Sequence, residues 1–313
     1  MGRFLYNAKG IFRYLLPRIL FDKQKYLDKV EQRSDYKYII DRVNYYNKLD
    51  SKIDMQVEGV GSCNKKIAIK DYKIPKKLIN YFYDSYEYLV YFPKDLEFIL
   101  ESGDVNYNLS YPALTKSRPI DSNNKNNILL NLDKIRHFSF VEDKIPFCAK
   151  DDILYFRGGV YQEHRIRFLS KYFHDSRCDL GHTGSIAESN KAFVKPKSSK
   201  QEHLRHKFIL SLEGNDVASN LKWIMNSNSI AIMPKPKFET WFMEGRLKGD
   251  YHYIEIDDDY NNVFEKIDYY KNNPRKAEVI IKNANSYCKE FMDKNREIII
   301  SLLVLEKYFK FTN

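Results

Sequence analysis

KFILSLEGNDVASNLKWIMNSNS, residues 207 to 229, carries the clearest signal of an α/β fold in the chain. KFILSL is an apolar run of strand length, and EGND is a turn cluster in which Gly214 can adopt a positive φ. From Val217 to Met225 apolar residues recur at helical spacing. The stretch therefore predicts half of a βα unit.

The turn in this stretch is a possible seat for phosphate. A strand that enters a helix through a Gly/Asn/Asp turn presents backbone N–H groups at the positive end of the helix dipole. In an open α/β sheet such a turn lies at the carboxyl end of the strands, where ligands bind. Two interpretations are open, because a βα loop also carries Gly and Asn for backbone reasons alone.

Composition indicates a folded protein with room for two α/β domains. The chain has 313 residues, of which 43% are hydrophobic and 30% charged. Its net charge of +10 would suit an anionic partner, although a composition biased toward Lys, Asn, Ile and Tyr explains part of it without function. The cysteines have neither metal-ligand nor disulfide spacing, which indicates a reducing compartment; they are Cys63, Cys148, Cys178 and Cys288.

The N-terminal stretch GRFLYNAKGIFRYLLPRILFDKQKY, residues 2 to 26, is amphipathic and basic. Its apolar residues alternate with Arg and Lys, and Pro17 interrupts it. One interpretation places the stretch in the interface of an anionic membrane, and the other packs it on the first domain with its charges in water. No segment of the chain reaches the roughly 18 apolar residues of a membrane span.

Two polar loops follow strand-like runs and carry candidate chemistry. After LEFIL comes a loop with Asp104, Lys116 and Arg118, and Arg136 lies farther on. A polar loop at the end of a buried strand is where an α/β domain places its functional residues, although turn formation and solvation also explain these residues. In YFRGG, Arg157 ends a predicted strand beside two glycines, and its planar guanidinium suits a phosphate.

Two acidic features have competing interpretations. Glu239 would accept hydrogen bonds from a ribose, or would be a carboxylate in the first turn of a helix. Asp257 to Asp259 resemble a metal-binding DxD triplet, but the run precedes a predicted helix, which favours a helix cap.

The segment DKIPFCAKDD, residues 143 to 152, marks the predicted domain boundary. Residues 1–150 would form one domain with the basic N-terminal segment. Residues 151–313 would form a second domain with two terminal helices, the second of which packs back across the domain interface. The alternation of strands and helices predicts two doubly wound domains that face a cleft.

Four motifs give the chain its resemblance to a known family. The segment from KFILSL to MEG, together with YFRGG, TKSRPI and HYIEID, resembles lipopolysaccharide-type members of glycosyltransferase family 90 over roughly residues 95 to 305. The resemblance implies a GT-B fold of two Rossmann-like domains, with residues 1–150 as the acceptor-side domain and residues 151–313 as the nucleotide-sugar-binding domain. It also implies inverting transfer from a UDP-sugar, with no required metal or other cofactor.

The resemblance also implies roles for single residues. Asp104 falls at the position of the catalytic base, Arg157 matches the strand-end arginine, and Gly214 to Asn220 match the nucleotide-binding turn. Many relatives carry Arg where this chain has Asn220, so that diphosphate contact would be missing, or Lys222, Arg118 or Arg165 would supply it. The expected donor-binding residues are Arg118, Arg157, Arg165, Glu213, Gly214, Asn215, Asp216, Ala218, Ser219, Asn220 and Glu239.

The resulting expectation is an inverting glycosyltransferase that moves a sugar from a UDP-sugar to a hydroxyl of a glycan. The acceptor would be lipopolysaccharide core or a related surface polysaccharide, reached from the cytoplasmic face of the inner membrane, and no nucleic acid would bind. Two alternatives are a metal-dependent GT-A-type transferase that uses Asp257 and Asp259, and a non-catalytic binder of polyanions or nucleic acid.

Overall fold

The computed structural model describes residues 2–53 and 66–313, so Cys63 lies outside the described residues. Contacts divide the chain into two compact units. Unit 1 comprises residues 1–137, 237–245 and 291–313, and unit 2 comprises residues 138–236 and 246–290. The sequence predicted one boundary near residue 150, whereas two later segments of the chain return to unit 1.

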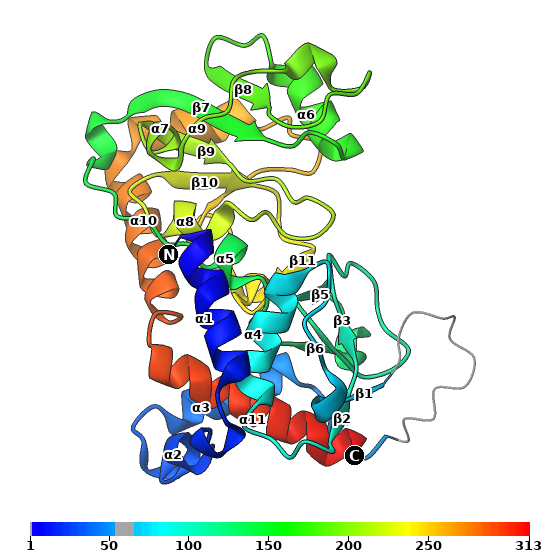
Figure 1. Cartoon of the computed structure of the whole chain (residues 1–313). Coiled ribbons are helices and arrows are strands. Elements are labelled where there is room, and N and C mark those ends of the chain that lie inside the picture. The colour runs from blue at the N-terminus through cyan, green and yellow to red at the C-terminus, as the bar shows by residue number, and fades with distance from the viewer. Residues whose placement is uncertain (1, 54–65) are drawn as a thin grey trace. The chain divides into compact units, whose positions relative to one another are not determined.

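Unit 2 is built on a five-stranded sheet in which every pairing is parallel, with the order β12-β10-β9-β7-β8 (Figure 1). This sheet confirms the predicted α/β class. Its strands are β7 (Asp151–Gly158), β8 (Cys178–His182), β9 (His206–Leu210), β10 (Ile230–Met233) and β12 (Ile254–Glu255).

The helices of unit 2 pack against the sheet through apolar side chains. Leu154 and Phe156 of β7 belong to a buried cluster with Phe168 and Ile280, which lie on two different helices. Such a layer of helix against sheet buries the apolar face of both elements. The helices are α6 (Glu163–Tyr172), α7 (Lys200–His203), α8 (Leu221–Met225), α9 (Val263–Asn272) and α10 (Pro274–Lys289).

The helix predicted to start at Val217 begins only at Leu221. The Asn220 side chain explains the delay, because it bonds to the end of β9 instead of continuing a helix. Its Nδ2 donates to the Leu210 carbonyl at 3.0 Å, and its Oδ1 accepts from the Ser211 hydroxyl at 3.1 Å. Asn side chains that bond nearby backbone compete with helix formation.

Unit 1 contains three small sheets. The central one is parallel, with the order β3-β4-β6, and the other two are antiparallel pairs, β1 with β2 and β5 with β11. The strands are β1 (Ile67–Ala68), β2 (Glu97–Phe98), β3 (Leu100–Glu101), β4 (Ala113–Thr115), β5 (Ser117–Pro119), β6 (Asn127–Leu129) and β11 (Phe238–Thr240).

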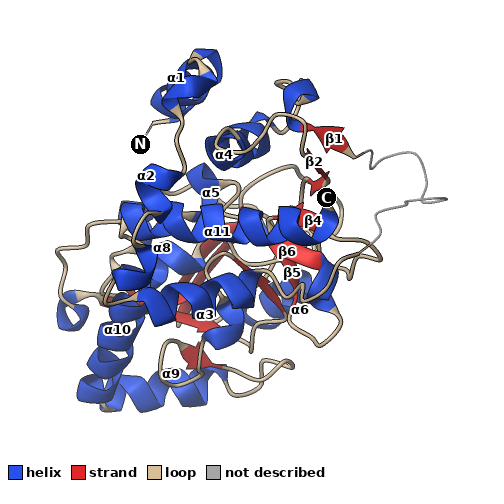
Figure 2. Cartoon of the chain, turned by 90° about the horizontal axis from the view of Figure 1, so that it is seen from below, coloured by secondary structure: helices blue, strands red, loops and turns tan. Residues whose placement is uncertain are grey.

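The C-terminal helix α11 belongs to unit 1, where it contacts α3, α4 and β2 (Figure 2). Leu302, Val304, Leu305 and Tyr308 along this helix are fully buried, which accounts for its strongly apolar sequence. The helices of unit 1 are α1 (Arg3–Leu15), α2 (Gln24–Leu27), α3 (Tyr36–Tyr46), α4 (Ile79–Leu89), α5 (Lys134–His137) and α11 (Lys294–Thr312).

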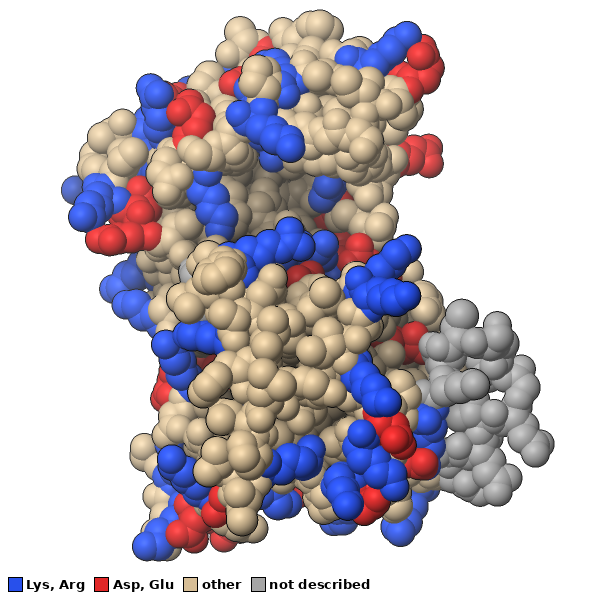
Figure 3. Space-filling model, in the orientation of Figure 1, with Lys and Arg blue, Asp and Glu red and all other residues tan. Residues whose placement is uncertain are grey.

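Helix α1 packs on α4 through its small and aromatic residues. A Cβ at Gly10 would lie 2.3 Å from the Tyr83 ring, so only glycine permits this approach. The Tyr14 ring packs edge-on against Phe82 and Tyr86. The apolar residues of α1 point the other way and are exposed, and Figure 3 shows Lys and Arg beside uncharged surface on this side of unit 1.

None of the helices within residues 2–53 and 66–313 is long and apolar enough to cross a membrane.

Candidate active site

The carboxyl ends of the parallel strands β3, β4 and β6 bring several charged side chains of unit 1 together. Asp104 follows β3, Lys116 follows β4 directly, and Asp133 follows β6. Carboxyl ends of parallel strands lie at one edge of a sheet, where α/β proteins place their ligands. The predicted base therefore lies at such an edge.

The backbone around Asp104 is held on both sides. Gly103 has a φ of 109°, which favours glycine, and its carbonyl accepts a hydrogen bond from the Tyr81 hydroxyl at 3.1 Å. The Val105 N–H donates to the Ser117 hydroxyl at 3.1 Å. These bonds fix the position from which the Asp104 side chain projects.

Two cations contact the Asp104 carboxylate. Lys116 Nζ lies 2.5 Å from Asp104 Oδ1, and Arg136 Nη2 lies 3.3 Å from the same oxygen. The Lys116 side chain is 1% exposed, whereas that of Asp104 is 28% exposed. A buried cation thus favours the ionised form of a carboxylate that solvent can still reach.

Sequence reasoning missed Asp133. Its Oδ2 accepts from Arg136 Nε at 2.8 Å, and its Oδ1 accepts from Asn80 Nδ2 at 2.7 Å. Burial raises the pKa of Asp133, although Arg136 and Lys116 act in the opposite direction. The sequence contained a signal for this residue, because Asp133 follows the strand-like run from 128 to 132 as Asp104 follows LEFIL.

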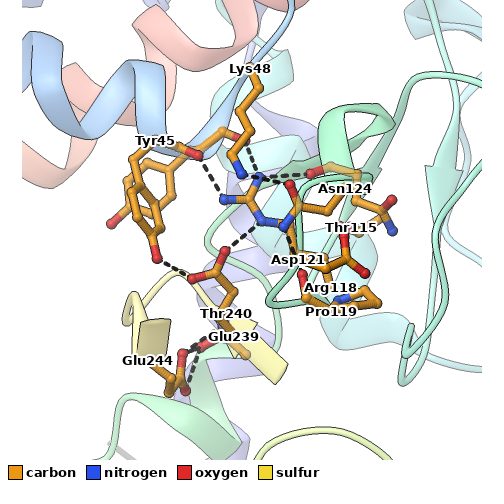
Figure 4. A network of polar contacts seen from close by, with 12 residues as sticks. Tyr45, Lys48, Thr115, Arg118, Pro119, Asp121, Asn124, Glu239, Thr240 and Glu244 are labelled. Atoms are coloured by element: carbon orange, nitrogen blue, oxygen red, sulfur yellow. Dashed lines mark hydrogen bonds and ion pairs between the residues drawn. The ribbon is translucent and has the colours of Figure 1, made fainter. Parts of the chain in front are cut away.

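Arg118 and Glu239 form a buried pair inside unit 1 (Figure 4). Arg118 Nε donates to Glu239 Oε1 at 2.8 Å, and the Tyr45 hydroxyl also contacts Glu239. The rest of the guanidinium donates to the carbonyls of Tyr45, Tyr46 and Asn127 at 2.7, 3.3 and 3.2 Å. Because Arg118 is fully buried among these acceptors, its placement favours a structural role over the predicted contact with the donor.

In unit 2 the sheet has a topological switch point between β7 and β9. Strand β8 lies on one side of β7, and the chain then crosses to β9 on the other side. Ligands of open α/β sheets bind outside the carboxyl ends of the strands at such a point. The predicted donor turn follows β9 and thus lies at this edge.

Arg165 of α6 joins the two loops at the switch point. Its Nη1 donates to the Gly159 carbonyl after β7 at 2.6 Å. Its Nη2 and Nε donate to the carbonyls of Leu212 and Glu213 after β9, at 2.6 and 2.8 Å. Burial lowers the pKa of Arg165 to about 10, so the side chain remains a cation at neutral pH.

The turn that was predicted to bind phosphate lies beside this cation. A Cβ on Gly214 would lie 3.5 Å from Arg165 Nη2, and the Gly214 N–H donates to the Asp216 carbonyl at 2.8 Å. Asn215 and Ser219 are exposed, whereas Asp216 and Ala218 are buried. The expectation of helix N-terminal N–H groups at residues 215–219 is wrong, because α8 begins at Leu221 and has five residues.

Arg157 lies near the end of β7 and is held by protein groups. Both oxygens of Asp179 accept from its Nη2 at 2.8 Å, and the carbonyls of Phe156 and Asp179 accept from its Nη1 at 2.9 Å. Burial raises the pKa of Asp179, but its ion pairs with Lys195 and Arg157 outweigh burial and leave this pKa below its usual value. A phosphate that binds Arg157 would compete with Asp179 for the guanidinium. The contact of Arg157 with the sugar donor stays a prediction.

The Asp257 to Asp259 run precedes α9, but none of these aspartates caps the helix: its N-cap residue is Asn262, whose side chain makes no cap hydrogen bond. Asp259 Oδ1 accepts from the Asn261 N–H at 3.0 Å, and Asn262 Oδ1 accepts from the Asp257 N–H at 3.0 Å. Within residues 2–53 and 66–313, no group of three His, Cys, Asp or Glu side chains is placed to hold a metal ion.

Comparisons with known proteins identify the class and then the family of the chain. It is 41% identical over 274 residues to the O-glucosyltransferase LpsA of Dichelobacter nodosus, an alignment that covers 87% of this chain and 82% of the relative. Such similarity defines the chain as a glycosyltransferase. The model of Glycosyl transferase family 90 matches residues 132–313, and the chain belongs to this family.

Proposed function

We propose that this protein is an inverting, metal-independent glycosyltransferase that transfers a hexosyl or pentosyl group from a UDP-sugar to a hydroxyl of a glycan. The observation that carries the proposal is the Asp104 carboxylate, which lies at the carboxyl edge of the unit 1 sheet and contacts the buried Lys116. A partly exposed carboxylate that stays ionised is suited to act as a general base.

Asp104 would remove the proton of the acceptor hydroxyl while the hydroxyl oxygen forms a bond to the anomeric carbon. The bond from that carbon to the diphosphate breaks at the same time, and its electron pair leaves with UDP. The transition state resembles an oxocarbenium ion, and negative charge grows on the diphosphate. The chain must therefore supply a base on the acceptor side and positive charge on the donor side.

The donor side would be the switch point of unit 2. Arg165 places a cation there, and the turn from Glu213 to Asn220 offers backbone N–H groups and exposed polar side chains. Preorganised donors and cations stabilise a departing diphosphate without reorganisation at the moment of reaction. We further propose a GT-B type fold.

The acceptor would be lipopolysaccharide core or a related surface glycan. The relative from Dichelobacter nodosus bears the name O-glucosyltransferase LpsA. This name makes UDP-glucose the first donor to test and a lipopolysaccharide-type glycan the first acceptor.

UDP release from a panel of UDP-sugars, measured in EDTA, tests the reaction. We expect wild type to turn over one donor and Asp104→Asn to lose about 10²- to 10⁴-fold in kcat, because the amide cannot accept the proton. The Kd for UDP should change less than twofold. Asp121→Asn, which changes another loop carboxylate of unit 1, is the matched control.

Three results would contradict the proposal. Full turnover by Asp104→Asn would exclude this residue as the base. Turnover that appears only with added Mn²⁺ would exclude a metal-independent reaction and favour the GT-A alternative with Asp257 and Asp259. A chain that turns over no donor, with or without metal, would leave only the non-catalytic alternative.

We also propose that α1 holds the enzyme on an anionic membrane. Phe4, Phe12 and Leu15 are 88%, 65% and 73% exposed, although α1 packs on α4 through its opposite face. The helix contains three basic residues and no acidic residue. An apolar stripe with basic flanks is suited to the interface of an anionic bilayer, where a lipid-linked acceptor would lie.

Flotation of the full-length protein with liposomes tests this contact. We expect binding to vesicles with anionic lipid, and Phe4→Ser/Phe12→Ser should weaken it at least about tenfold, because each buried Phe contributes about 1.5 to 3 kcal/mol. Tyr107→Ser, which removes another exposed aromatic ring of unit 1, should bind as wild type does. Equal binding of all three proteins would refute the proposal.

A further inference from the structure

Two carboxylates and two cations of unit 1 share one network beside the proposed base. Asp104 contacts both Lys116 and Arg136, and Arg136 extends between Asp104 and Asp133. His137 Nε2 lies 3.7 Å from Asp133 Oδ2. Arg136 is therefore the link between a residue that would take part in the reaction and a carboxylate without an assigned role.

We propose that Asp133 is a positioning residue that holds the Arg136 guanidinium against the Asp104 carboxylate. The inference rests on the proposed role of Asp104 as the base. Asp133 would act through Arg136 and would not touch the substrate.

The difference in exposure between the two residues supports this role. The Arg136 side chain is 49% exposed, whereas that of Asp133 is 7% exposed. A half-exposed arginine samples many rotamers unless its partners order it. The 2.8 Å bond from Arg136 Nε to Asp133 Oδ2 orders this side chain, whose Nη2 also lies 3.3 Å from His137 Nε2.

Asp133 is itself fixed in an unusual conformation. Its φ of 55° lies in the left-handed region, which residues other than glycine adopt infrequently. Its carbonyl accepts from the N–H groups of Arg136 and His137 at 3.1 Å, and its Oδ1 accepts from Asn80 of α4. Strained residues that the surroundings hold in place often belong to functional sites.

The direction in which the protonation of Asp104 shifts distinguishes a positioning role of Asp133 from a direct effect of its charge. If Asp133 acts by holding Arg136, its loss releases a cation from Asp104 and makes Asp104 easier to protonate. If Asp133 acts only as a nearby negative charge, its loss makes Asp104 harder to protonate. Lys116 also contacts Asp104, and both cases leave it in place.

The pH dependence of kcat/KM, measured with Asp133→Asn, Arg136→Gln and the double variant, is the test. We expect the acid limb to move to higher pH by about one unit in each single variant, since an opposite charge at this range shifts a carboxyl by one to three units. The double variant should move no farther than Arg136→Gln. A limb that moves to lower pH in Asp133→Asn, or does not move, would overturn the proposal.

Three further variants complete the test. Asp95→Asn removes an exposed carboxylate paired with Lys70 and should leave the limb unchanged. If Asp133→Asn does not fold, Arg136→Lys replaces it, because lysine keeps the charge but lacks the planar fork whose separate nitrogens contact Asp133 and Asp104. A profile of Arg136→Lys equal to wild type would then count against the proposal. Full activity of Asp104→Asn would show that Asp104 is not the base. An acid limb that does not move in Asp133→Asn would instead contradict only the positioning role of Asp133.

Discussion

At the scale of single residues, buried histidines make unit 2 sensitive to acid. Burial lowers the pKa of His203, of His206 and of His252, and the pKa of His252 falls to about 4. His252 Nδ1 accepts the Lys248 N–H at 3.0 Å, and its ring packs 5.1 Å from that of Tyr287. These histidines are neutral in the folded protein over a range of pH in which the unfolded chain binds protons.

The melting temperature should therefore fall as the pH falls below 6.5, the ordinary pKa of histidine. Above that pH neither state is charged at His252, and between about 6.5 and about 4 only the unfolded state takes the proton. His252→Asn should weaken this dependence, because the amide oxygen can replace Nδ1 and does not titrate. Scanning calorimetry from pH 7.5 to 4.5 measures it.

The matched control for this prediction is His174→Asn, which changes an exposed histidine of the same unit. It should show the same fall of melting temperature as wild type. If His252→Asn and His174→Asn lose stability in parallel with wild type, His252 makes no contribution to the acid sensitivity.

Residue identity alone did not separate Arg118 from Arg165, two of the three arginines that were predicted to meet the donor. Arg118 is fully buried with Glu239 and three carbonyls, whereas Arg165 joins the two loops at the switch point. The difference arises from what lies opposite each guanidinium, and in Arg118 that partner is 121 residues away in the chain.

At the scale of elements, the period of α1 was predictable but the direction of its faces was not. The alternation of apolar and basic residues predicts an amphipathic helix, and α1 spans Arg3–Leu15. Its contact with α4 uses Tyr6, Gly10 and Tyr14, and not the apolar stripe. The choice follows from the shape of α4, because the Tyr83 ring accepts only a glycine opposite it.

For helix α8, the spacing of apolar residues predicts the wrong starting residue. Apolar spacing predicts a helix from Val217, yet α8 begins at Leu221. The spacing of side chains does not reveal that Asn220 bonds to the Leu210 carbonyl, which ends the preceding turn. Side-chain to backbone bonds of this kind override helical periodicity.

At the scale of the whole molecule, unit 1 is assembled from three separate segments of the chain. Arg118 and Glu239 join the first segment to the second, and their strands β5 and β11 pair at these two residues. Arg42 pairs with Glu297 of the third segment, and Trp241 Nε1 donates to the same glutamate at 2.5 Å. Buried ion pairs thus hold the segments together.

Removal of one partner should destabilise the protein strongly. We expect Arg118→Met to lower the free energy of unfolding by about 3 to 5 kcal/mol, because it leaves Glu239 buried without its cation. Arg118→Met/Glu239→Gln should recover part of this loss, since no buried charge remains. Urea unfolding followed by circular dichroism measures both.

The exposed pair of Lys125 with Asp50 is the control for these variants. Lys125→Met should cost less than about 1 kcal/mol, because solvent screens an exposed pair. Equal losses in Lys125→Met and Arg118→Met would show that burial of the Arg118 pair adds nothing to stability.

From the sequence, the resemblance of four motifs indicated the family. The spacing of residues close together in the chain indicated the α/β class, the strand-end position of Asp104 and the amphipathic period of the N-terminal helix. Only the tertiary structure decided which cations meet Asp104, that Asp133 joins them, that Arg118 is enclosed and which face of α1 is exposed. Each of these depends on side chains that meet across distant segments, which no local pattern specifies.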